Sequence, residues 1–157
     1  MQNIYAMNTA YQNLLKEAQT LINSGKPRTL ILKETSVLLK NNVHHYDWVG
    51  FYILDENQIL ILGPYSGKPT EHKAIAIGQG VCGQVAESLK LKVVQDVSKE
   101  GNYIACSLDV QSEIVVPILR EGQFKAEIDI DSHSPAPFTP EDEEFLGKLC
   151  CQLSVLF

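Results

Sequence analysis

Glu127, Asp129 and Asp131 occupy alternate positions of an otherwise apolar stretch near the C-terminus. Successive side chains of a β-strand point to opposite faces, so the three acids would share one face of a sheet. The ordinary interpretation is a solvated sheet face. The alternative is a polar pocket, in which the acids accept an ammonium group or hold a proton, and burial and mutual repulsion raise the pKa of one of them.

A fourth acid, Glu113, begins the apolar stretch 113–119, which pairs with 124–130 in a predicted β-hairpin. An acid at the end of a strand is usually exposed to solvent. Pairing within this hairpin would nevertheless allow Glu113 to reach the same pocket as Asp129 and Asp131.

The chain has four cysteines, and none belongs to a CxxC pair, so a structural zinc site is not expected. Cys82 lies in a Gly-Val-Cys-Gly segment, where the start of a helix would lower the pKa of the thiol. Cys106 lies in an irregular segment just before the hairpin, and the adjacent Cys150 and Cys151 fall on the last predicted helix. For each thiol taken singly, the ordinary role is that of a small buried hydrophobic residue. The histidines also lack metal-ligand spacing, so we expect neither a metal nor a cofactor.

These residues must be positioned by helices at both ends of the chain and by a meandering sheet between them, which predicts an α+β domain. Apolar residues recur at helical spacing in the terminal segments and alternate in the central ones. Thr139 followed by Pro140 marks the start of the last helix. We predict helices at 10–22 and 28–42, a short helix that is entered through the glycine-rich residues 78–83 and ends near 89, and a last helix from 139 to the C-terminus. Strands are predicted at 48–54, 59–63, 72–77, 92–94, 113–119 and 124–130.

The charge and the hydropathy pattern exclude several classes of function. The net charge is −6 and lysines and arginines form no block, which argues against nucleic acid and anionic membranes as partners. No apolar run approaches the roughly 20 residues that span a bilayer, and the N-terminus has no secretory signal pattern. We therefore expect a cytoplasmic protein, in which a reactive cysteine is more commonly catalytic or redox-cycling than structural.

Seven segments together resemble the GAF-type free methionine-(R)-sulfoxide reductases in order and spacing, from about residue 45 to the last helix. The resemblance implies one GAF domain over residues 1–157, with a central antiparallel β-sheet flanked by N- and C-terminal helices and the helices on one side. Within it, N-terminal helices would occupy 1–42, the sheet and active-site segments 45–132, and the C-terminal helix 139–157. The matching segments are Asp47–Tyr52, Leu62–Pro69, Gly80–Gly83, Asp96–Val97, Ile104–Cys106, Ser112–Pro117 and Ile128–Ser132.

The same resemblance implies a thiol chemistry. Cys106 matches the nucleophile that attacks the sulfur of free methionine-(R)-sulfoxide. The oxygen is released as water, and Cys106 passes through a sulfenic acid. Cys82 matches one position of the second thiol, which would condense with Cys106 to a disulfide, and thioredoxin is the expected reductant.

The acids and two aromatic residues match the substrate pocket of that family. Glu113, Asp129 and Asp131 would bind the substrate's amino group and assist protonation of the sulfoxide oxygen, which is a poor leaving group otherwise. Trp48 would flank the S-methyl group, and Tyr52 is a further candidate for the pocket wall. An α-ammonium partner implies specificity for the free amino acid over a peptide.

Two positions depart from the family pattern. His72 stands where many members have an additional cysteine that is often the main recycling partner, and Glu127 adds an acid where an apolar residue is usual. The alternatives are therefore a GAF domain that binds a small molecule without turnover, or a redox sensor that uses Cys82 and Cys106 as a switch. A homodimer through the terminal helices is also expected, because the last helix ends in apolar residues.

Overall fold

The computed structural model describes residues 6–104 and 107–157. Within these ranges the strands form one six-stranded sheet in the order β3-β2-β1-β6-β5-β4, and every neighbouring pair is antiparallel. The strands are β1 (Trp48–Leu54), β2 (Ile59–Ser66), β3 (Ala74–Ala76), β4 (Lys92–Val94), β5 (Ser112–Arg120) and β6 (Gln123–Ser132).

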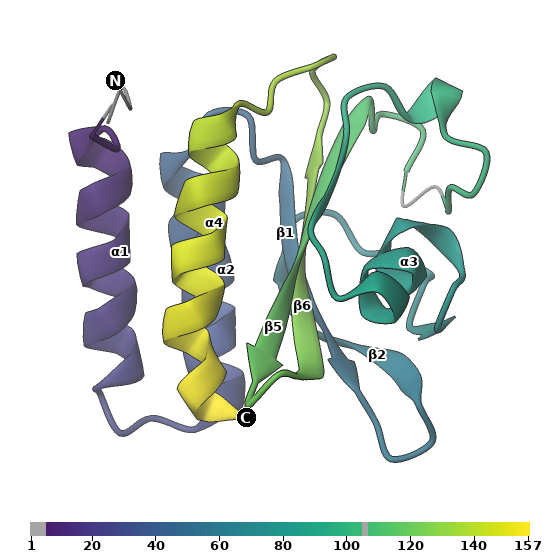
Figure 1. Ribbon diagram of the computed structural model, residues 1–157. Coiled ribbons are helices and arrows are strands. Elements are labelled where there is room, and N and C mark those ends of the chain that lie inside the picture. The colour runs from purple at the N-terminus through teal and green to yellow at the C-terminus, as the bar shows by residue number, and fades with distance from the viewer. Residues whose placement is uncertain (1–5, 105–106) are drawn as a thin grey trace, which may run out of the picture.

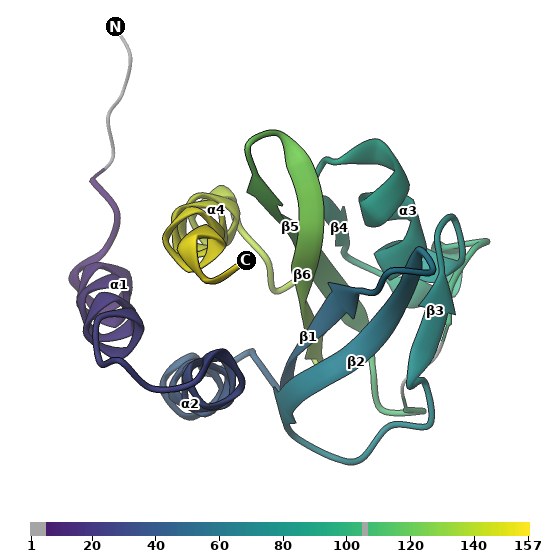
Figure 2. The ribbon, with the colours of Figure 1, turned by 90° about the horizontal axis from the view of Figure 1, so that it is seen from below.

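The helices cover the sheet unequally. Helices α1, α2 and α4 form a layer on one face, and the short α3 lies against the other (Figures 1 and 2). The predicted α+β class, with a central antiparallel sheet flanked by N- and C-terminal helices, is confirmed, and α3 adds a short helix on the second face. None of the described helices is both long and apolar enough to cross a bilayer. The helical segments are α1 (Thr9–Ile22), α2 (Arg28–Asn42), α3 (Gly80–Ser88), η1 (Val97–Lys99), α4 (Pro140–Leu153) and η2 (Ser154–Leu156).

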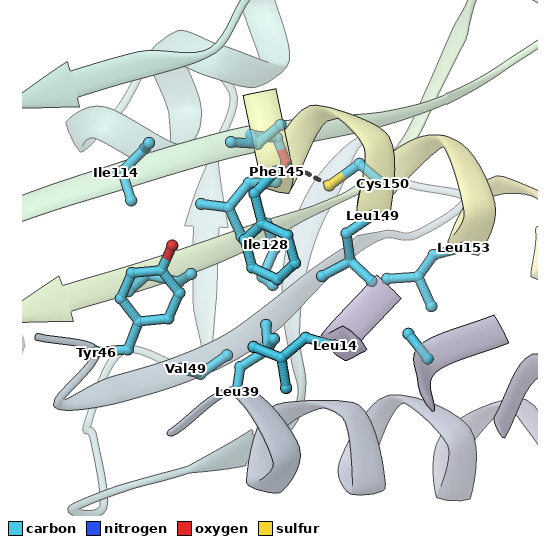
Figure 3. Packing of buried hydrophobic residues seen from close by; sticks show 14 of the residues in the cluster. Leu14, Leu39, Tyr46, Val49, Ile114, Ile128, Phe145, Leu149, Cys150 and Leu153 are labelled. Atoms are coloured by element: carbon cyan, nitrogen blue, oxygen red, sulfur yellow. Dashed lines mark hydrogen bonds between the residues drawn. The ribbon is translucent and has the colours of Figure 1, made fainter. Parts of the chain in front are cut away.

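The main hydrophobic core lies between the sheet and the layer of three helices (Figure 3). Ile128 from β6 and Phe145 and Leu149 from α4 are buried in it, and each such side chain contributes about 1.5–3 kcal/mol of transfer free energy. Cys150 belongs to the same core, as expected, and its thiol donates to the carbonyl of Val116 at 3.8 Å. Alternation along β6 thus sends Ala126, Ile128 and Ile130 to this core and the acids to the opposite face.

The start of α4 is tied to the rest of the helical layer by the buried carboxylate of Asp142. It accepts hydrogen bonds from the hydroxyls of Tyr11 (2.5 Å) and Tyr46 (2.7 Å) and from the backbone N–H of Thr139 (2.8 Å). The Nε2 of His45 lies 2.9 Å away. Burial alone would raise the pKa of Asp142, but hydrogen bonds from these four residues outweigh it and hold that pKa at about 2. Asp142 is therefore an ionised structural carboxylate.

Candidate active site

Four acidic side chains gather on the α3 face of the sheet. The register of β5 and β6 sets Glu113 directly opposite Asp131, and the alternation of β6 puts Glu127 and Asp129 on the same face. Each of the four is at most 4% exposed. The ordinary interpretation of a solvated acidic face is therefore wrong for this strand, because α3 and the chain that follows it cover the acids. We call these four residues the acidic cluster.

The acidic cluster is short of hydrogen-bond donors. Neither carboxylate oxygen of Glu127, nor Oδ1 of Asp129, accepts a hydrogen bond of ordinary geometry from a described residue. Burial, reinforced by the neighbouring acids, raises the pKa of Glu113 and of Glu127 well above the ordinary value, and burial also raises the pKa of Asp129. These groups consequently hold protons that an exposed carboxyl would lose, and they favour a cationic ligand.

Cys82 lies in the first turn of α3 and faces the acidic cluster. Its Sγ and one carboxylate oxygen each of Glu113 and Asp129 all lie within 4.8 Å of one another. Burial, followed by the charges of Asp129, Glu127 and Glu113, raises the pKa of the Cys82 thiol well above the ordinary value. The expectation that the helix start lowers this pKa is wrong, because desolvation and nearby carboxylates outweigh the helix dipole.

The segment that leads to Cys106 docks on the start of α3. Asn102 accepts a hydrogen bond from the N–H of Gly80 (2.9 Å) and donates one to the carbonyl of Gly78 (2.9 Å). Gly80 has a φ of +64°, and a Cβ there would lie 2.8 Å from Cδ1 of Ile104. Only glycine fits this close approach without strain. Cys106, the predicted nucleophile, lies outside the described residues, so its role stays a prediction.

Two small cavities adjoin the acidic cluster. One of about 10 Å³ is lined by Cys82, Glu113 and Asp129 together with His72 and Ile104. The other has a volume of about 30 Å³. Each has room for roughly one water molecule. A ligand as large as an amino acid therefore requires the covering residues to move. Residues lining the larger cavity include Trp48, Asp131, Lys68, Ser107 and His133.

The aromatic wall is built by Trp48 on β1. Its indole lies across Gly50, where a Cβ would come 2.2 Å from the ring, and its N–H donates to the carbonyl of Lys68 at 3.0 Å. The ring also stacks on Tyr65 with centroids 5.4 Å apart. Tyr52, by contrast, lines neither cavity, and its hydroxyl donates to the carbonyl of His72 at 2.8 Å. Tyr52 thus positions the segment of His72, and its contact with substrate stays a prediction.

The sequence spacing gave no metal-ligand pattern, whereas the fold assembles one thiol and two carboxylates from three separate elements, α3, β5 and β6. No local spacing could reveal this group, because its members meet only through sheet pairing and the packing of α3. A surface groove of about 540 Å³ between α1 and α2 lies in the helical layer, and no cysteine or histidine lines it.

Comparison with known proteins gives consistent matches over nearly the whole chain. The GAF domain family model matches residues 7–156. The free methionine-R-sulfoxide reductase of Escherichia coli is 35% identical over 143 residues, 91% of this chain and 86% of that protein. GAF domain-containing protein A of Dictyostelium discoideum is 34% identical over 139 residues, 88% of this chain and 87% of that protein. The X-ray structure of free methionine-R-sulfoxide reductase from Neisseria meningitidis, in complex with its substrate, superposes with a TM-score of 0.89 at 33% identity, covering 97% of this chain and 92% of that one.

Proposed function

The chain belongs to the GAF domain family and is homologous to the free methionine-R-sulfoxide reductases, and from this premise we propose that it reduces free L-methionine-(R)-sulfoxide to methionine. The observation that carries the proposal is the buried acidic cluster beside the Cys82 thiol. Structural carboxylates in a folded core are paired, as Asp142 is, whereas Glu127 and Asp129 retain unused acceptor atoms. An unused acceptor that borders a small cavity, as at Asp129, is the expected complement of an ammonium group.

Substrate recognition follows from charge. An α-ammonium placed against Asp129 supplies the missing donors and converts a protonated carboxyl into an ionised partner. A residue inside a peptide has no such ammonium, so the buried carboxyl groups would remain unpaired and binding would be weak. Trp48 lines the neighbouring cavity with Asp131, where an apolar S-methyl group would pack on the indole.

The reduction itself needs a nucleophile and an acid. The thiolate of Cys106 attacks the sulfoxide sulfur, and Glu113, whose pKa burial raises, supplies a proton to the sulfoxide oxygen. Once protonated, the sulfoxide oxygen leaves as water, and the Cys106 sulfur stays bonded to the methionine sulfur. Water then attacks the Cys106 sulfur, the sulfur–sulfur bond breaks, methionine leaves, and Cys106 becomes a sulfenic acid. Ile104 and Ser107, which flank this part of the chain, line the two cavities of the acidic cluster. The described residues on either side of 105–106 therefore line the proposed site, which supports the proposal.

Recycling would proceed through Cys82. Its thiol condenses with the Cys106 sulfenic acid, forming a disulfide and releasing water, and thioredoxin then reduces the disulfide. The raised pKa of Cys82 makes its deprotonation the demanding part of this step. His72 lines the same cavity but brings no thiol, so the protein depends on Cys82 more heavily than a relative with an additional cysteine.

The test is to count methionine formed per chain. Pre-reduced protein is mixed with L-methionine-(R)-sulfoxide, with and without a thioredoxin system, in parallel with Cys106→Ser. We expect many turnovers with thioredoxin and none in Cys106→Ser. The exposed Cys151 gives a matched control, because Cys151→Ser should leave turnover unchanged.

Two other outcomes separate the parts of the proposal. If each chain formed one equivalent of methionine and then stopped, Cys106 would be supported as the nucleophile and recycling through Cys82 would be refuted. No methionine from pre-reduced protein would refute the reductase and leave the second candidate, a GAF domain that binds a small molecule or senses redox state. The presence of His72 in the cavity of Cys82 is the observation that favours this candidate.

We also propose that the protein forms a homodimer through its terminal helices, because Val155 in η2 is 60% exposed at the apolar end of the chain. Sedimentation equilibrium should show a dimer, which Val155→Asp weakens. A monomer at high protein concentration would contradict this arrangement.

A further inference from the structure

The thiol of Cys82 and the carboxylates of Glu113 and Asp129 form a compact set of potential ligands. One ligand atom from each lies within 4.8 Å of the other two, and the three residues come from α3, β5 and β6. All three are buried, so their positions are fixed by the sheet and by the packing of α3 rather than by flexible loops. Such a set differs from surface acids, whose side chains are dispersed and hydrated.

A second observation points independently to a cationic ligand. Glu127 is 0% exposed, and neither of its carboxylate oxygens accepts a hydrogen bond of ordinary geometry from a described residue. It lies beside Cys82, since its charge and a thiol contact both affect the pKa of that cysteine. A buried carboxyl group whose nearest donor is a thiol is costly unless a proton or a cation neutralises it. An amino acid brings one positive charge to the acidic cluster, whereas a divalent metal ion brings two.

We propose that Cys82, Glu113 and Asp129 bind a divalent transition-metal ion, for which Zn²⁺ is the best match. Thiolate sulfur together with carboxylate oxygens suits Zn²⁺, whereas Mg²⁺ and Ca²⁺ take oxygen ligands alone. Zinc bonds of about 2.3 Å to sulfur and about 2.0–2.2 Å to oxygen place the ligand atoms of a tetrahedral site roughly 3.3–3.8 Å apart. Since the three atoms lie within 4.8 Å of one another, the contraction needed is at most roughly 1.0–1.5 Å, which side-chain rotation can supply.

Binding is balanced by the release of protons. The Cys82 thiol and any protonated carboxyl group among Glu113 and Asp129 lose their protons to solvent as the metal bonds form. The ion with one thiolate and two carboxylates then carries a net charge of −1. No oxidant or reductant is needed, because Zn²⁺ has no redox chemistry.

Occupancy has a consequence that rests on the proposed function. Zinc at this site would hold the Cys82 sulfur away from a Cys106 sulfenic acid, and it would occupy two carboxylates proposed for the substrate's ammonium. The metal-bound protein would therefore bind free methionine sulfoxide weakly and would be protected from disulfide formation. Metal binding itself does not depend on turnover.

The test uses Co²⁺ as a spectroscopic substitute for Zn²⁺. Pre-reduced Cys106→Ser protein is titrated with Co²⁺, and the thiolate-to-cobalt charge-transfer band is recorded. We expect one ion per chain, a band that Zn²⁺ abolishes, and loss of that band in Cys106→Ser/Cys82→Ser. A further Cys151→Ser substitution, which removes the exposed thiol on α4, should leave the band unchanged.

A second variant guards against misfolding. Glu113→Gln keeps both the shape of the side chain and the Cys82 thiol, and it should raise the Co²⁺ dissociation constant at least tenfold. Absence of a thiolate band, or a band that survives Cys82→Ser, would overturn the metal site. Because the readout is absorption by a variant that cannot turn over, failure of metal binding leaves the reductase untouched. Failure of the turnover assay equally leaves the metal site standing.

Discussion

The two faces of the sheet bury carboxylates in opposite ways. On the helical face, Asp142 is surrounded by donors, with Tyr11, Tyr46 and Thr139 within 2.8 Å, and its pKa falls to about 2. On the α3 face, Glu127 is equally buried but makes no hydrogen bond of ordinary geometry to a described residue, and its pKa is raised. The same type of group thus stabilises the fold at one face and is held unsatisfied at the other.

The difference teaches how to separate structural from functional acids in one molecule. A carboxylate with a full set of hydrogen-bond donors contributes to stability, and its loss should destabilise the fold without any specific effect on ligand binding. A buried carboxylate that lacks hydrogen-bond donors lowers stability, and its loss should weaken ligand binding while the fold persists or gains stability.

The largest effect should come from Asp129→Asn. Removing the charge that pairs with an α-ammonium should lower kcat/KM for free L-methionine-(R)-sulfoxide by about 100-fold or more. Urea unfolding should show a midpoint equal to or above that of the unsubstituted protein. Steady-state kinetics with thioredoxin provide the measurement, and a loss of activity that merely parallels a loss of folded protein would contradict the functional assignment.

Asp142→Ala should destabilise the protein by about 3 kcal/mol, because it leaves four donors without their acceptor, two of them the buried hydroxyls of Tyr11 and Tyr46. Chemical denaturation measures this directly. Under conditions where Asp142→Ala is fully folded, its kcat/KM should stay within about twofold of that of the unsubstituted protein. A selective loss of catalysis in fully folded Asp142→Ala would erase the distinction between the two faces.

The two faces should also respond oppositely to pH. The depressed pKa of Asp142 contributes roughly 2 kcal/mol of stability that is present above its unfolded pKa of about 3.9 and is lost as pH falls toward 2. The raised pKa values of Glu113 and Glu127 act in the other direction. Their contribution is complete below an unfolded pKa of about 4.3 and is lost as pH rises through the folded values.

The free energy of unfolding, measured with urea between pH 2 and pH 9, separates these two effects as an acid limb and a higher-pH limb of the stability curve. Asp142→Asn should flatten the acid limb only, and Glu127→Gln should flatten the limb at higher pH only. If Glu127→Gln changed the acid limb instead, the assignment of opposite pKa shifts to the two faces would be wrong.

The smallest effect is expected from Glu127→Met, an unbranched replacement of similar volume. Removing a buried carboxyl group that lacks donors should stabilise the fold by about 1 kcal/mol at neutral pH. Differential scanning calorimetry provides the check, with Glu17→Met in the helical layer as a surface control. A clear destabilisation by Glu127→Met would mean that this carboxyl group has a structural partner.

Much of the architecture follows from local sequence patterns. The predicted 28–42 helix and 48–54 strand match α2 and β1, and Thr139 with Pro140 marks the start of α4 as expected. Apolar periodicity and capping are local signals, so short windows are sufficient to detect them. The third strand is shorter than predicted, since only Ala74–Ala76 pairs with β2.

The chemistry of the site depends on contacts that no window contains. Tyr11 and Asp142 are separated by 131 positions, so their hydrogen bond left no local pattern. Alternation placed the acids of β6 on one face, but only the packing of α3 decides that this face is buried. The same packing reverses the expected pKa shift of Cys82. The helix start can be recognised from neighbouring residues in the sequence, whereas the desolvation that raises this pKa comes from residues distant in the sequence.

The central claim is that the unsatisfied carboxylates bind the substrate's ammonium group, and calorimetric titration of Cys106→Ser protein tests it most directly. Free L-methionine-(R)-sulfoxide and its N-acetyl derivative are compared as ligands, with Asp129→Asn added in a second series. We expect binding of the free amino acid, at least a 100-fold weaker affinity for the N-acetyl derivative, and a comparable loss in Asp129→Asn. Equal affinity for the two ligands would contradict it.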